Sequence, residues 1–158
     1  MDSSAVQEQY VDDVYGYLAY RAGSREAAED LTQQTLERAL RGWGSFDPGR
    51  GHARTWVLAI ARSVYIDSRR LGMSGSRSSG KVRESLVNES DLVGAVGPDP
   101  QITAALRRLE LRERETIALR FGADLRVAEI AEVLGVSISN AQQILSRALR
   151  RLHSILDA

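Results

Sequence analysis

The middle of the chain, residues 72–100, constrains the fold more than any other feature of the sequence. This segment is rich in glycine and serine and has no aromatic residue, whereas the residues on either side are dense in helix formers. Such a composition cannot bury enough apolar surface to offset the entropy lost on ordering, so we expect a flexible linker, with at most a short helical turn near 81–87. The sequence therefore predicts an all-α protein in which two small helical domains, residues 1–71 and 101–158, are joined by residues 72–100.

The composition excludes several classes of protein. The chain has no cysteine and only two histidines, so we expect no disulfide, no metal site and no cofactor. No apolar run approaches the length of a membrane span, and the first ten residues lack the order of a signal peptide, so we expect a cytoplasmic protein that does not insert into a membrane. An enzyme is the weakest interpretation, because no catalytic triad spacing or phosphate-binding glycine motif occurs.

Three helices are expected in the first domain. The first covers about residues 6–21, the second starts after Ser24 as N-cap and runs to Arg41, and the third covers about residues 52–71. A glycine-rich loop separates the second from the third. On the second helix the side expected to be buried carries Ala28, Leu31, Thr35 and Ala39, joined by Leu36 and Leu40.

The third helix has two distinct arcs in helical projection. The arc expected to be buried carries Trp56, Val57, Ile60, Val64 and Leu71. A second arc gathers Arg54, Arg62, Tyr65 and Arg69 within roughly 80°. Guanidinium groups bind phosphates and a tyrosine ring can stack on an unpaired base, so this arc is a candidate nucleic-acid surface. A solvated charged face is the simpler alternative.

The segment VAEIAEVLGVSISNAQQILS matches a helix-turn-helix. The apolar positions that such a pair must bury are Ile130, Leu134, Val136, Ala141 and Ile144. Ala131 stands where the two helices cross closely, and Gly135 stands at the turn, where a positive φ is required. Ser137 or Ser139 can cap the second helix, which is expected from about Ile138 to Leu156. A helical hairpin that binds no nucleic acid is the alternative.

The second helix of this motif separates apolar and polar side chains. Its apolar arc carries Ile138, Ala141, Ile144, Leu145, Ala148, Leu152 and Ile155. Serine and amide side chains stand near the amino end of the polar arc and arginines stand further along. Short polar groups at that end suit base edges in a major groove, and the arginines suit phosphates.

These segments resemble a known family. EDLTQQTLERALRGWGSFDPGRGHARTWVLAIARSVYIDSRR is similar to region 2 of bacterial sigma factors of the extracytoplasmic-function (ECF) group. LRRLELRERETIALRFGADLRVAEIAEVLGVSISNAQQILSRALRRL is similar to region 4 of the same group. The two motifs stand in the right order and are joined by a linker of suitable length. The resemblance implies a promoter-specificity subunit that binds core RNA polymerase through the β′ clamp helices and the β flap.

The resemblance also implies roles for individual residues. The β′ clamp is expected to bind Asp30, Leu31, Gln33, Gln34 and Glu37, with Leu31 and Leu36 either in that interface or in the core. The melted −10 promoter element, with its flipped base, is expected at Asp47, Arg50, Gly51, Arg54, Trp56, Arg62, Tyr65, Asp67 and Arg69. The −35 element is expected at Arg126, Ser137, Ser139, Asn140, Gln142, Gln143, Ser146, Arg147 and Arg150. An anti-sigma protein, often anchored in the membrane, is a further implied partner.

The recognition helix departs from the family pattern. The usual run is similar to Thr-Val-Lys-Ser-Arg, whereas residues 140–144 read Asn-Ala-Gln-Gln-Ile. Gln142 and Ile144 replace the customary basic residues, and Arg126 replaces the usual Ser or Thr before the first helix. Either Gln142 or Gln143 reads an adenine in an unusual −35 element, or the −35 contact is weak and depends on arginines and on polymerase.

Two other functions remain open at this point. A sigma-like regulatory protein would bind polymerase or an anti-sigma partner without efficient −35 recognition. A free-standing helix-turn-helix repressor would bind DNA without polymerase. The charge disfavours the repressor, since residues 1–71 carry nine basic and ten acidic side chains and residues 101–158 carry nine and seven. Neither domain is strongly basic, so we expect weak binding to bare DNA.

Overall fold

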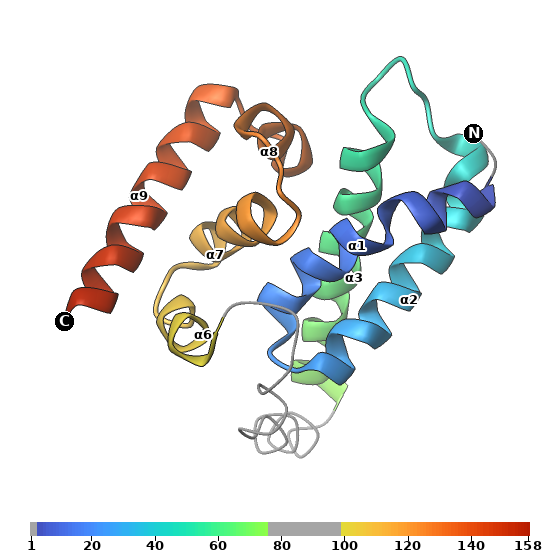
Figure 1. Ribbon diagram of the computed structural model, residues 1–158. Helices are drawn as coiled ribbons and strands as arrows, with labels where there is room; N and C mark the ends of the chain where they lie inside the picture. The colour runs from blue at the N-terminus through green and yellow to red at the C-terminus, as the bar shows by residue number, and fades with distance from the viewer. Residues whose placement is uncertain (1–2, 76–98) are drawn as a thin grey trace.

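The computed structural model describes residues 3–75 and 99–158, and within these ranges every regular element is helical. The first unit consists of α1 (Ser3–Ala22), α2 (Arg25–Gly42), the short 3₁₀ helix η1 (Trp43–Ser45) and α3 (Ala53–Gly75). Helices α1, α2 and α3 each pack against the other two (Figure 1). The predicted all-α fold class is confirmed.

Local capping defines the start of α2 as the sequence predicted. The Ser24 side chain accepts a hydrogen bond from the backbone N–H of Ala27 at 3.2 Å. This bond satisfies one of the N–H groups that the first helical turn leaves without a partner. The predicted side of α2 is buried. Its buried residues are Ala28, Leu31, Thr32, Thr35, Leu36 and Ala39.

The second unit begins with α6 (Pro100–Leu106) and α7 (Leu111–Ile117), continues through the single π-helical turn η2 (Ala118–Gly122), and ends with α8 (Val127–Leu134) and α9 (Ile138–Asp157). Helices α8 and α9 form the predicted helix-turn-helix. Gly135 ends α8 in the left-handed region with φ of 70°, and the Ser137 side chain caps α9 by accepting from the Asn140 N–H at 3.0 Å. Both predictions are confirmed.

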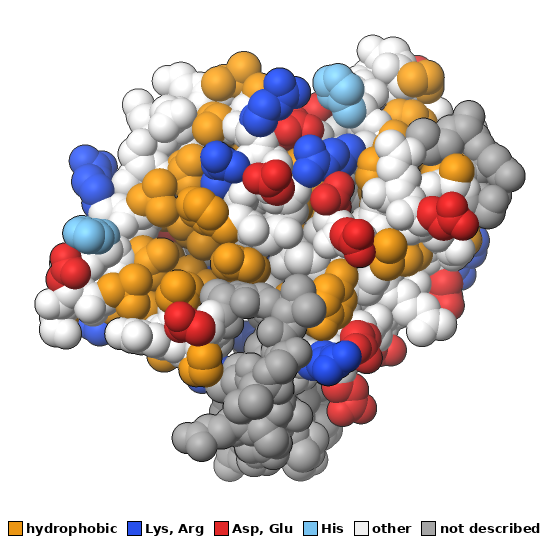
Figure 2. Space-filling model, viewed as in Figure 1, with side chains coloured by type: hydrophobic (Ala, Val, Ile, Leu, Met, Phe, Trp, Pro, Cys, Tyr) orange, Lys and Arg blue, Asp and Glu red, His pale blue; other side chains and the backbone are white. Residues whose placement is uncertain are grey.

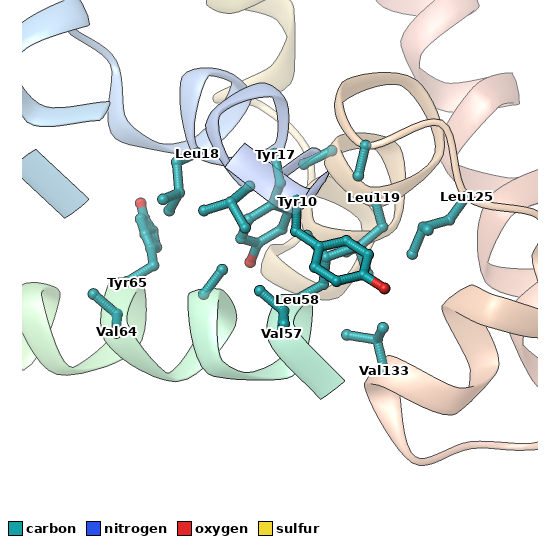
Figure 3. Packing of buried hydrophobic residues seen from close by; sticks show 14 of the residues in the cluster. Tyr10, Tyr17, Leu18, Val57, Leu58, Val64, Tyr65, Leu119, Leu125 and Val133 are labelled. Atoms are coloured by element: carbon teal, nitrogen blue, oxygen red, sulfur yellow. The ribbon is translucent and has the colours of Figure 1, made fainter. Parts of the chain in front are cut away.

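The two units pack against each other and share one hydrophobic core, an arrangement that the sequence did not predict. Figure 3 shows Tyr17 of α1 and Leu58 of α3 near Leu119 of the second unit, and Leu18 and Leu125 lie in the same cluster. All five side chains are almost completely buried. Close approach of the backbones makes this contact possible, because a Cβ on Gly16 would overlap the carbonyl oxygen of Gly122.

Only the two ends of the predicted linker, residues 72–75 and 99–100, are among the described residues. Helix α3 continues to Gly75, beyond the predicted end at Leu71, and α6 begins at Pro100 with the Asp99 side chain as its cap. The expectations of flexibility and of a helical turn near 81–87 lie outside the described residues.

Two apolar residues that were predicted to be buried are exposed. Leu71 on α3 and Ile138 on α9 keep 69% and 58% of their surface accessible. Ile138 is the first residue of its helix, and Leu71 lies near the end of α3, so both stand at helix ends, away from the packed middle of the helices. Elsewhere α3 buries two sides, one against α1 and α2 and the other against α8. The predicted apolar arc left out Leu58, Ala61 and Tyr65, which are also buried.

No helix in residues 3–75 or 99–158 is at once long enough and apolar enough to cross a membrane.

The left-handed turn at Gly135 gives the first testable prediction. An added Cβ at Gly135 meets no atom within 4 Å, so the cost of Gly135→Ala comes from the backbone conformation alone. We expect Gly135→Ala to lower the free energy of unfolding by about 1–2 kcal/mol. Gly135→Asn should cost less, because asparagine tolerates this conformation.

Urea unfolding followed by circular dichroism measures these changes. Gly44→Ala is the matched control, since its added Cβ also meets nothing within 4 Å and the Gly44 backbone is not left-handed. Equal stability of Gly135→Ala and Gly44→Ala would contradict the role of the turn.

Candidate DNA and polymerase interfaces

Arg54 of the predicted −10 face lies between the two units. Its Nε donates to Oδ2 of Asp13 at 2.9 Å, its Nη1 donates to Oε2 of Glu129 at 3.3 Å, and its Nη2 donates to the carbonyl of Ala123 at 2.6 Å. Burial opposes the charge, but the two carboxylates outweigh this effect and raise the pKa of Arg54. The guanidinium is thus a fully charged group that joins α1, α3 and α8.

Arg62 and Tyr65 continue the same contact along α3. Arg62 forms an ion pair with Glu115 of α7, a residue that keeps only 7% of its surface exposed. Tyr65 is also buried, and the guanidinium of Arg21 lies 4.4 Å from the centre of its ring. The Tyr65 ring is therefore not exposed to an unpaired base in this arrangement, and its role in DNA binding stays a prediction. Arg69, one turn further, is exposed.

The loop between α2 and α3 rests on three aromatic rings. Trp43 stacks on Phe46 with ring centroids 5.2 Å apart, and Trp56 lies 5.8 Å from Trp43 and 5.3 Å from Phe46. Trp56 is half-buried and packs against the shared core, so it lies between the core and the loop and supports the loop. This placement favours the structural role for Trp56 over a direct role in base stacking.

The predicted base-capturing part of this loop is also held by α8. The Asp47 side chain accepts from the Gly49 N–H at 2.9 Å and lies 3.6 Å from Arg50. Glu132 accepts from the backbone N–H of His52 at 3.3 Å, and a Cβ on Gly51 would collide with the same carboxylate. Glu132 therefore occupies the space beside Gly51.

Asp67, another predicted −10 residue, faces α2. Its Oδ2 lies 3.4 Å from Nη1 of Arg38, and both side chains are about half exposed. This pair links the outer ends of two helices and leaves Asp67 at the surface.

The predicted polymerase face of α2 is exposed. Gln34 donates to Asp30 at 2.8 Å, and Gln33 donates to Glu37 at 3.5 Å, so the four polar side chains form two hydrogen-bonded pairs along one exposed strip. Leu31 and Leu36 are buried, which resolves the alternative for these two residues in favour of the core.

The polar face of α9 is exposed as well. One shallow groove is lined by Gln142, Gln143, Ser146, Arg147 and Arg150. Ser139 and Asn140 lie exposed in the first turn of α9, whereas Ser137 serves as its cap. Ile144 is buried, as predicted. Arg126 precedes α8 with an exposed side chain, and its backbone N–H donates to Glu129 at 3.0 Å.

Sequence reasoning missed the acidic residues that face α3. They are Glu115 on α7 and Glu129 and Glu132 on α8. Glu129 stands three residues after the N-cap Arg126, a spacing that indicates capping and gives no sign of a distant partner. Among the described residues, no three His, Cys, Asp or Glu side chains are placed to hold a metal ion.

Comparison with known proteins decides the family. The sigma-70 region 2 family matches residues 6–72, and the sigma-70 region 4 family matches residues 105–154. The RNA polymerase sigma factor YlaC of Bacillus subtilis is 30% identical over 147 residues, which cover 89% of this chain and 83% of that protein. The chain belongs to the ECF group of RNA polymerase sigma factors. Helices α1–α3 of this sigma factor are thus its region 2, and α6–α9 include its region 4.

Other relatives agree with this assignment. The ECF sigma factor BldN of Streptomyces coelicolor is 32% identical over 157 residues, but the alignment spans 58% of that longer protein and 94% of this sigma factor. Two solved structures share the fold at lower identity. RpoE of Bartonella quintana, solved with the anti-sigma factor NepR, has a TM-score of 0.72 at 21% identity and covers 98% of this chain and 96% of its own. CnrH, solved with the cytosolic domain of CnrY, has a TM-score of 0.70 at 20% identity, with coverage of 98% and 87%.

The contact between region 2 and region 4 predicts a pH dependence of stability. Burial raises the pKa of Glu129, but the Arg126 backbone and the charge of Arg54 outweigh it, so the net pKa is lowered. A carboxylate with a lowered pKa stabilises the folded state above its unfolded pKa, and this stabilisation is lost as the pH falls through the folded value. We therefore expect Glu129→Gln to reduce the loss of stability on acidification.

Urea unfolding at neutral pH and at about pH 3.5 measures this difference. Glu8→Gln makes the same change at an exposed position of α1 and serves as control. Identical pH dependence of Glu129→Gln and the unaltered chain would contradict the predicted contribution.

Proposed function

We propose that this sigma factor binds core RNA polymerase and directs it to specific promoters, with region 2 melting the −10 element and region 4 contacting the −35 element. The observation that carries the proposal is the presence of both sigma regions in one chain, each with an exposed polar face. This specificity subunit acts without a catalytic group of its own and works in the cytoplasm.

Polymerase docking is assigned to α2. The strip formed by Asp30, Gln33, Gln34 and Glu37 lies on the side opposite the buried residues of the helix. Side chains ordered by mutual hydrogen bonds lose less entropy when a partner binds, which favours a specific interface. We assign this strip to the β′ clamp helices, and region 4 to the β flap.

Recognition of the −10 element is assigned to α3 and the loop before it. Asp47, Arg50 and Gly51 stand in the loop and suit a flipped base, which needs hydrogen-bonding groups and close backbone approach. Arg54, Arg62 and Arg69 follow along α3 and suit the phosphates of the separated strand. Asp67, held beside Arg38, lies next to this path.

Recognition of the −35 element is assigned to α9. Gln142 and Gln143 stand in the exposed groove, and an amide side chain can form two hydrogen bonds with an adenine in the major groove. Arg147 and Arg150 lie one and two turns further along the same face and suit phosphates. The groove therefore supports an altered −35 preference rather than loss of recognition.

An anti-sigma protein is the remaining proposed partner. Two proteins of the same fold, RpoE of Bartonella quintana and CnrH, were solved with NepR and with the cytosolic domain of CnrY, respectively. We propose that a protein of this kind controls the present sigma factor and can hold it at the membrane.

A sigma-like regulatory protein is the second candidate function. The feature that favours it is the altered recognition helix, in which Gln142 and Ile144 replace the customary basic residues. Transcript mapping with reconstituted holoenzyme separates the two. Defined start sites that share −10 and −35 sequences support the proposal. Tight binding to core polymerase without a specific start site across a promoter library would establish the regulatory alternative.

Substitutions of the α3 arginines and of the α2 amides should affect different steps, promoter opening and polymerase binding, respectively. We expect the double variant Arg62→Ala, Arg69→Ala to weaken promoter opening more than polymerase binding, because phosphate contacts form only on the separated strand. The salt slope of open-complex formation should fall by about one for each lost phosphate contact. Gln34→Ala should instead weaken capture by the β′ clamp. Equal loss of both steps in the double variant would contradict the assigned face.

The amides and arginines of α9 should also behave differently. Gln142→Ala and Gln143→Ala should relax sequence preference at one −35 position, at a cost of about 1–3 kcal/mol on the preferred base. Arg147→Ala and Arg150→Ala should weaken binding to all −35 sequences alike. Holoenzyme binding to a −35 substitution series measures both effects, and a uniform loss with the glutamine variants would contradict base reading.

A further inference from the structure

The charges along α3 are compensated at its start but not further along the helix. Arg54 is paired with two carboxylates, and in Figure 2 basic and acidic side chains gather at the boundary between α8 and the start of α3. Arg62 is paired with Glu115. Arg69 is exposed, and no carboxylate in the described part of the chain forms an ion pair with it. The basic side chains of this helix therefore change from paired to unpaired.

Two further arginines lie near Arg69. Arg21 stands in the last turn of α1, and the carbon of its guanidinium lies 4.4 Å from the centre of the Tyr65 ring. Arg114 on α7 is half-buried and lies within electrostatic reach of the other two arginines and of Tyr65. We name Arg21, Arg69 and Arg114 the arginine cluster. Three helices thus bring three guanidinium groups around one tyrosine ring.

The charge of the arginine cluster has no counterpart among the described acids. None of its three guanidinium groups forms an ion pair with a carboxylate of residues 3–75 or 99–158. Burial and the charges of Arg21 and Arg69 lower the pKa of Arg114, while Tyr65 acts in the opposite direction. Arginine stays protonated at neutral pH, so these like charges repel each other. A local excess of positive charge therefore exists in a chain whose formal net charge is zero.

Polar atoms in and beside the arginine cluster lack hydrogen-bond partners. Nη1 of Arg21, Nε of Arg114 and the hydroxyl of Tyr17 are buried, and no described residue forms a hydrogen bond with them. Tyr17 is completely buried, and Figure 3 shows its ring and the Tyr65 ring between α1 and α3. Buried polar groups in native proteins nearly always have a partner, so several orphaned groups at one place indicate a missing ion or ligand.

We propose that the arginine cluster is a binding site for a small phosphate-bearing anion. A phosphate group has oxygens on all sides, and each oxygen can accept a hydrogen bond from a guanidinium. The anion enters beside exposed Arg69, and its charge offsets the excess at the half-buried Arg21 and Arg114. Inorganic phosphate and the terminal phosphates of a nucleotide present the same chemistry to this site.

The arrangement favours a compact anion over a nucleic-acid strand. A strand is followed by cations spaced along a groove, whereas these three arginines lie on three helices around one ring. The proposal goes beyond the promoter function and does not depend on it. Arg69 also belongs to the proposed −10 face, but Arg21 and Arg114 have no part in the proposed function. Variants at these two positions therefore test the anion site separately.

Calorimetric titration of the full chain with inorganic phosphate, pyrophosphate and ADP tests the site. Sodium chloride keeps the ionic strength constant, so that general screening is the same in every titration. Arg21→Gln and Arg114→Gln each remove one charge from the cluster. Arg112→Gln makes the same change at an exposed position of α7 and is the matched control. Circular dichroism verifies that each variant is folded.

We expect saturable binding to the unaltered chain, with pyrophosphate bound more tightly than phosphate because it carries more charge. Arg21→Gln and Arg114→Gln should each weaken binding by about tenfold to a hundredfold, as expected for loss of a charge-assisted hydrogen bond. Arg112→Gln should leave the affinity unchanged. Tighter binding of ADP than of pyrophosphate would identify a nucleotide as the ligand, and weaker binding would identify free phosphate groups. Either result supports the site.

Urea unfolding separates ligand binding from a structural role of Arg114. Phosphate should raise the urea midpoint of the unaltered chain above its value in chloride, because a ligand that binds only the folded state stabilises it. The increase should disappear in Arg114→Gln. It should persist in Arg112→Gln, which accounts for the general effect of phosphate salts on stability. A purely structural role for Arg114 would lower the midpoint equally in both salts.

Three results would overturn the proposal. The first is the absence of saturable binding to the unaltered chain. The second is the same phosphate affinity in Arg21→Gln, Arg114→Gln and Arg112→Gln, which would mean an adventitious ion only. The third is displacement of pyrophosphate by short single-stranded DNA that binds more tightly through Arg21 and Arg114, which would assign the cluster to a DNA-binding face.

Discussion

The backbone contact between Gly16 of α1 and Gly122 at the end of η2 is the constraint on which the arrangement of this sigma factor depends. Since neither residue has a side chain, the neighbouring residues Tyr17, Leu18 and Leu119 meet in a single core. That core fixes the direction in which α7 and α8 face α3. The pairing of arginines with glutamates is a consequence of this geometry.

The same contact explains part of the charge balance of the chain. Equal numbers of basic and acidic side chains reduce the long-range electrostatic field, and some of these charges also pair with each other across the contact. Arg54 and Arg62 are paired with acids that lie 75 and 53 residues away, in the other sigma region. Ion pairs of this kind contribute little when solvated, but Glu115 is largely buried, so loss of Arg62 removes its ionic partner. Glu129 is also largely buried, and it keeps Arg126 as a second partner. These ion pairs therefore mark the surfaces at which region 2 and region 4 meet.

Several local features followed correctly from the sequence. Ser24 and Ser137 cap their helices, Gly135 adopts a positive φ, and Ile144 packs inward, as expected. Caps and turns depend on residues within one helical turn, so a single chain suffices to predict them. The exposed polar strip on α2 and the polar groove on α9 also followed from the separation of polar and apolar arcs.

The same reasoning failed where a second surface decides burial. Tyr65 shares an arc with three arginines, yet it is buried, with the guanidinium of Arg21 from α1 over its ring. Helical projection assigns one buried face to each helix, and α3 buries two. The sequence alone determined the two helical regions, their caps, their family and the polar faces, because each depends on local periodicity or on short motifs. Only the tertiary structure decided that Arg54 and Arg62 of region 2 pair with acids of region 4, because that contact joins residues far apart in the chain through shape and charge that no local pattern records.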